Sequence, residues 1–86
     1  MEFEELKEIA NRVERSGAHR STLDAECINK NISMVNRLVI TRLIFVYKRF
    51  RNKEMTEDAA KNQVEDIKQM WEKLNEQGRF CVECQG

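Results

Sequence analysis

The chain has 86 residues, no proline, three glycines and a formal net charge of zero, with 35% of its residues charged. This length predicts a single helical domain, residues 1–86, whose core is marginal without good packing, a staple or oligomerisation. Arg37 and Arg42 interrupt the most apolar stretch, so we expect no transmembrane span. The acidic start, Met-Glu-Phe-Glu-Glu, does not read as a signal peptide, and we expect an intracellular, cytoplasmic protein with reduced thiols.

Charge is segregated along the chain. Residues 1–16 carry five acidic and three basic side chains, for a net charge of −2. Residues 17–53 carry two acidic and eight basic side chains (+6), and residues 54–86 carry eight acidic and four basic ones (−4). One interpretation is a basic central helix held between acidic neighbours. The other is a basic strip that binds nucleic acid or an acidic partner.

Apolar residues at helical spacing predict an all-α fold. The expected elements are helices over about 2–16, 22–51 and 57–77, followed by a tail over 79–86. Because a short turn joins the second and third helices, we expect them to lie antiparallel as a hairpin. These elements together predict a three-helix bundle built on the long central helix.

Residues near the expected helix ends support these boundaries. Ser16-Gly17 ends the first helix, and Ser21-Thr22-Leu23-Asp24 has the pattern of a capping box for the second. Thr56 is the expected N-cap of the third helix, and Gly78 is its expected C-terminal stop. Weak helix formers between residues 29 and 33 leave a break near 31–33 open.

A helical wheel divides the central helix into two apolar faces. The broad arc predicts core positions, which are Ile28, Ile32, Val35, Val39, Ile40, Leu43, Ile44, Val46, Tyr47 and Phe50. Met34, Leu38 and Phe45 lie on the opposite side, bordered by Arg42 and Arg49. Either the helix is buried nearly all round, or this second face contacts a protein partner. Self-association as a homodimer is the commonest form of such a contact.

Three cysteines and one histidine leave the role of the thiols open. If facing residue numbers in the hairpin sum to about 108, Cys27 lies beside Cys81 and Cys84, and the His19 loop is at the same end. Three thiolates and one imidazole form a ligand set for structural zinc, which would staple the core. The alternatives are reduced thiols, with Cys27 in the core, or a disulfide or redox pair.

The sequence carries no catalytic signature. It has neither a phosphate-binding glycine loop nor an H-E-x-x-H motif, and we expect a non-catalytic protein-binding module without a small-molecule substrate. The alternative is a small nucleic-acid-binding regulator that uses the basic face of the central helix, with or without the zinc staple. Its candidate contacts are Arg37, Lys48, Arg49, Arg51 and Lys53.

One segment, at about residues 42–75, carries a resemblance to a known family. It consists of Arg42-Leu-Ile-Phe-Val-Tyr-Lys-Arg-Phe-Arg-Asn-Lys-Glu-Met-Thr-Glu-Asp-Ala-Ala-Lys and the Ile/Met/Trp/Leu helix that follows. It resembles small helical hairpin proteins encoded by prophages of Gram-positive bacteria. Those proteins have an aromatic-rich helix ending in Tyr, a short polar turn, and an apolar-Thr/Ser-x-x-x-Ala entry into a second helix. The resemblance implies a phage or mobile-element protein. Such proteins include inhibitors of host defence, among them anti-CRISPR proteins, which act by occluding a surface.

Overall fold

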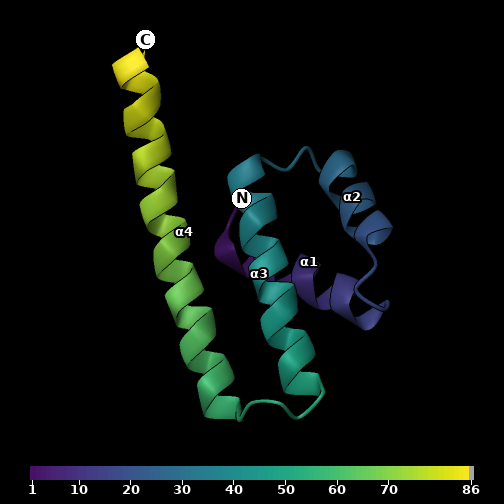
Figure 1. Cartoon of the computed structure of the whole chain (residues 1–86). Helices are drawn as coiled ribbons and strands as arrows, with labels where there is room; N and C mark the ends of the chain where they lie inside the picture. Colours follow the sequence, from purple (N-terminus) through teal and green to yellow (C-terminus); the bar gives the residue numbers. More distant parts are fainter. Residues whose placement is uncertain (86) are drawn as a thin grey trace.

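The computed structural model describes the backbone of residues 1–85 and the side chains of residues 1–76. Four helices follow one another along the chain: α1 (Phe3–Arg15), α2 (Arg20–Asn29), α3 (Met34–Arg51) and α4 (Glu57–Gln85) (Figure 1). No strand occurs within residues 1–85, so the predicted all-α class is confirmed. The stretch 22–51, expected as one helix with a break near 31–33 left open, forms two helices, and the chain has four helices over residues 1–85 where three were expected.

The break between α2 and α3 has a local cause. Asn31 takes a left-handed backbone conformation, with φ of 53°. The N–H of Ile32 then donates to the carbonyl of Cys27 at 3.0 Å, which closes α2 with a Schellman motif. Ser33 begins the next helix, because its Oγ accepts a hydrogen bond from the N–H of Asn36 at 3.2 Å. Two of the weak helix formers noted in the sequence therefore end α2 and begin α3: Asn31 ends the first helix and Ser33 caps the second.

Two other predicted ends differ from the structure. The pattern at residues 21–24 is not a capping box, since α2 begins at Arg20 with His19 as its N-cap. Gly78 does not stop α4, which continues to Gln85. A glycine inside a helix is less favourable than alanine by about 1 kcal/mol, but no proline follows it to end the helix. Thr56 is confirmed as a cap, because its Oγ1 accepts from the N–H of Ala59 at 3.2 Å.

Helix α3 is the centre of the fold. It packs extensively against α1 and against α4, and α3 and α4 run antiparallel (Figure 1). The core they enclose is formed by Phe3, Leu6, Ile9, Ala10, Val13, Leu23, Cys27, Val39, Ile40, Leu43, Ile44, Val46 and Ile67. Trp71 of α4 stacks in a tilted arrangement on Phe3 at 5.5 Å and donates from Nε1 to Oδ1 of Asn36 at 2.8 Å. The Trp71–Asn36 hydrogen bond places α4 beside α3 in a register close to the one predicted for the hairpin.

Helix α2 is held less extensively than the other helices. It contacts α1 sparingly and lies to the side of α3 in Figure 1. Two ion pairs hold it in place. Arg37 of α3 pairs with Asp24, and Arg12 of α1 pairs with Glu26 at 3.5 Å. Leu23 and Cys27 also join α2 to the core, but α2 packs sparsely against α3.

Two positions of the predicted core arc are exposed, and Val35 is half-buried outside the core cluster. Ile28 has 78% of its surface exposed, because the break at Asn31 moves it from the central helix onto α2. Phe50 is 45% exposed near the end of α3. The five central positions of the arc, which are Val39, Ile40, Leu43, Ile44 and Val46, are buried as predicted.

Candidate functional site

One face of α3 remains uncovered by α1 and α4. Met34, Leu38 and Phe45 expose 81%, 47% and 61% of their surface on this face. Arg42 and Arg49, also exposed, share it because residues three and four apart lie on one side of a helix. We call these five residues the α3 strip. Most large apolar residues of small proteins are buried, so a row of three exposed ones on one helix is unusual.

The α3 strip borders a groove between α3 and α4, which we call the α3–α4 groove. Its lining residues are Arg42, Phe45, Val46, Arg49, Gln63, Asp66 and Ile67. Among residues 1–76, neither arginine forms an ion pair. Their guanidinium groups are therefore available to an incoming carboxylate.

A second groove lies between α2 and α3, which we call the α2–α3 groove. It has a volume of about 370 Å³ and is lined by Val13, Ala18, His19, Arg20, Leu23, Arg37, Thr41, Ile44, Phe45 and Lys48. Leu23 and Ile44 are nearly buried and form an apolar floor. Phe45 lines both this groove and the α3–α4 groove, so its ring forms the ridge between them.

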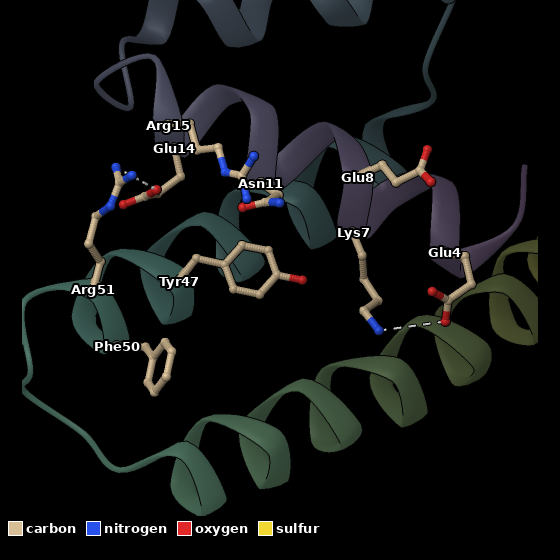
Figure 2. A pocket seen from close by; sticks show the side chains of 9 residues that line it. All are labelled: Glu4, Lys7, Glu8, Asn11, Glu14, Arg15, Tyr47, Phe50 and Arg51. Carbon is tan, nitrogen blue, oxygen red and sulfur yellow. Dashed lines mark ion pairs between the residues drawn. The ribbon is translucent and has the colours of Figure 1, made fainter.

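A third groove, the α1–α3 groove, is shown in Figure 2. Its lining residues are Glu4, Lys7, Glu8, Asn11, Glu14, Arg15, Tyr47, Phe50 and Arg51. Glu14 is 6% exposed and pairs with Arg51 at 3.1 Å, and Lys7 pairs with Glu4 at 3.6 Å. Burial, with a smaller contribution from the Glu4 charge, raises the pKa of Tyr47, which projects from α3 into the groove. Four of the six charged side chains that line this groove are therefore paired with each other.

The structure separates the five cations predicted for nucleic-acid binding. Arg37 pairs with Asp24, and Arg51 pairs with Glu14. Lys48 lines the α2–α3 groove and Arg49 the α3–α4 groove, while Lys53 lies in the loop after α3. These side chains are spread from the first turn of α3 to the loop after it instead of forming one patch.

Two of the four predicted zinc ligands, His19 and Cys27, lie among the residues whose side chains the structure describes. Cys27 is buried on α2, and not on an extension of α3, so the hairpin register that brought it to the tail cysteines does not apply. Desolvation raises the pKa of its thiol. His19 is exposed at the start of α2. The side chains of Cys81 and Cys84 lie outside the described residues. Residues 1–76 hold no group of three side chains placed to bind a metal.

Sequence reasoning missed the α2–α3 groove. Its basic side chains come from the loop before α2, from α2 and from α3, and an unbroken helix over 22–51 leaves no place for them to meet. The excess of positive charge over residues 17–53 was the available signal.

None of the helices, over the residues described, is long and apolar enough to cross a membrane. Comparison of the chain with protein-family models, curated proteins and solved structures finds no match.

Proposed function

We propose that this protein is a non-catalytic protein-binding module and that the α3 strip is its contact surface. The observation that carries the proposal is the exposure of Met34, Leu38 and Phe45 on one helix face, next to two arginines without intramolecular partners among residues 1–76. Aromatic, methionine and arginine side chains are the types enriched at protein interfaces. Burying this strip would favour binding, because each Å² of apolar surface removed from water contributes a favourable free energy of roughly 25 cal/mol.

The proposal includes two kinds of occupant. A second copy of the chain would give a homodimer through the strip, the commonest symmetric arrangement. Alternatively, the strip binds a foreign protein. The resemblance to prophage hairpin proteins makes a component of host defence the natural target, and the protein would inhibit that component by covering its surface. In either case binding is the function.

The test introduces charge into the strip. We expect the double variant Leu38→Asp/Phe45→Asp to remain helical by circular dichroism, because both side chains are exposed. The matched control is Asn62→Asp/Gln69→Asp, which adds the same charge to exposed positions of α4. Light scattering over a range of concentrations measures self-association. A photo-crosslinking residue at position 38, compared with one at position 69, detects a foreign partner in the cells that make the protein.

Association or crosslinks that depend on the strip and survive the control substitutions support the proposal. A protein that stays monomeric at millimolar concentration and gives no adduct specific to position 38 would overturn it.

A further inference from the structure

On the basis of the proposed protein-binding function, we propose that the α2–α3 groove receives an acidic amphipathic segment of a foreign partner protein. An apolar side chain of that segment lies on the groove floor, and its carboxylates pair with the basic rim. This inference specifies the chemistry of the partner at the border of the α3 strip.

The floor of the groove is apolar. Leu23 and Ile44 belong to the core and present only their outer edges, while Phe45 stands as an exposed wall. The volume of about 370 Å³ lies within the ~300–1,000 Å³ typical of ligand sites. A leucine or an aromatic side chain in this space would cover the otherwise exposed ring of Phe45.

The rim of the groove is basic and carries no carboxylate. Of its ten lining residues, His19, Arg20, Arg37 and Lys48 are the titratable ones. Asp24 balances Arg37 from outside the groove. Among residues 1–76, Arg20 and Lys48 form no ion pair, so both remain available. Complementary charge around an apolar pocket selects an acidic apolar ligand and disfavours a basic one.

A second copy of the chain fits the groove poorly. The acidic helix α4 exposes no large apolar side chain between residues 57 and 76. Both carboxylates of α2 are already paired. The acidic start of α1 buries Phe3, which leaves Met1 as the exposed apolar residue there. Over residues 1–76 the acidic helices therefore lack this combination, which favours a different protein as the occupant.

Nucleic acid fits less well than an acidic peptide. Phosphate binding requires cations along a continuous path, whereas the described cations around α3 are divided among separate grooves. The floor of the groove is built from aliphatic and aromatic side chains, and it offers burial to an apolar side chain.

The experiment is a titration of the ¹⁵N-labelled protein with synthetic helical peptides. The first peptide carries leucines on one face and glutamates beside them. The second replaces the glutamates with lysines, and the third replaces the leucines with serines. We expect amide shifts centred on His19, Arg20, Thr41 and Lys48 with the first peptide, and at least about tenfold weaker binding with the other two. The amide of Asn62 on α4 serves as the distant reference.

The variant Arg20→Gln/Lys48→Gln tests the rim. It should weaken the first peptide roughly fivefold, because it removes two exposed charge pairs. The control Lys30→Gln/Lys73→Gln removes the same charge from exposed positions away from the groove and should leave the affinity unchanged.

Three results would overturn the inference: no groove-centred shifts at millimolar peptide, equal binding of the acidic and basic peptides, or equal loss in the control variant. Groove shifts with a DNA or RNA oligonucleotide but not with the acidic peptide would also overturn it and assign the rim to phosphate. Failure here, together with strip-dependent association or crosslinking, would leave the proposed function standing.

Discussion

The α1–α3 and α2–α3 grooves border the same helix but use charge in different ways. The α1–α3 groove is lined by three carboxylates and three cations, and two ion pairs connect them within the chain. The α2–α3 groove is lined by three basic side chains and one histidine, and by no carboxylate. In the first groove, the Glu14–Arg51 pair joins α1 to α3, whereas the Lys7–Glu4 pair lies within α1. The second leaves charge and apolar surface that the chain itself does not satisfy.

This difference follows from how the helices pack. Where α1 packs closely on α3, charged residues at the edge find partners and seal the contact, as Glu14 and Arg51 do. Where α2 stands away from α3, one ion pair, Arg37–Asp24, joins the two helices, while Arg20 and Lys48 form no ion pair within residues 1–76. Stability should therefore depend on residues toward α1, and binding on residues toward α2 and along the strip.

The largest expected effect separates core from surface on α3 itself. Leu43 is fully buried, and Leu43→Ala should lower the free energy of unfolding by about 3 kcal/mol, through lost burial and a cavity. Leu38 is half exposed, and the same substitution there should lower it by less than about 1 kcal/mol. Urea denaturation measures both. Equal losses would show that the strip is part of the core.

The next effect contrasts two arginines near the end of α3. Arg51→Ala removes the partner of the buried Glu14 carboxylate and should lower the free energy of unfolding by about 2 kcal/mol. Arg49→Ala should change it by less than about 0.5 kcal/mol, since Arg49 forms no ion pair within residues 1–76. If Arg49→Ala proved the more damaging, the division between structural and available charge would be wrong.

A smaller effect concerns the loop that carries His19 to the α2–α3 groove. Gly17 has φ of 103°, and a Cβ there would lie 2.8 Å from Nε2 of His19. Gly17→Ala should lower the free energy of unfolding by about 1 kcal/mol through backbone strain. The double variant Gly17→Ala/His19→Ala removes the side-chain contact but keeps the strain, so it should recover little in thermal denaturation. Full recovery would place the cause in the imidazole contact.

The smallest effect is the alkaline pH dependence contributed by Tyr47. Its pKa is raised from 10.0 in the folded state, chiefly by burial and further by Glu4. The neutral phenol is therefore favoured by folding, and this stability is fully present below about pH 10 and is lost as the pH rises through the folded-state pKa. Tyr47→Phe should show a shallower decline of stability above pH 10 than the wild type. Parallel curves would indicate that the hydroxyl is solvated.

Much of the fold follows from local pattern. Helical spacing identified the buried positions of α3 and the apolar stripe of α4, and it placed Met34, Leu38 and Phe45 on a separate face from the core. Thr56 and Ser16-Gly17 mark real helix ends. These features depend on residues within a few positions of each other, where backbone geometry fixes which side chains share a face.

The candidate groove could not be predicted in this way. The break at Asn31 depends on whether a left-handed turn closes α2, and weak helix formers alone leave that undecided. The groove itself joins His19 and Arg20 to Lys48, residues far apart in the chain. Their proximity depends on where the Arg37–Asp24 and Arg12–Glu26 pairs hold α2.

The sequence by itself therefore determined the helical class, several helix ends and the outward apolar face of α3, because these are properties of one helix at a time. The tertiary structure decided which cations pair within the chain and which line an open groove. The reason is physical: a charge is satisfied or left available according to what packs beside it, and that neighbour comes from a distant segment.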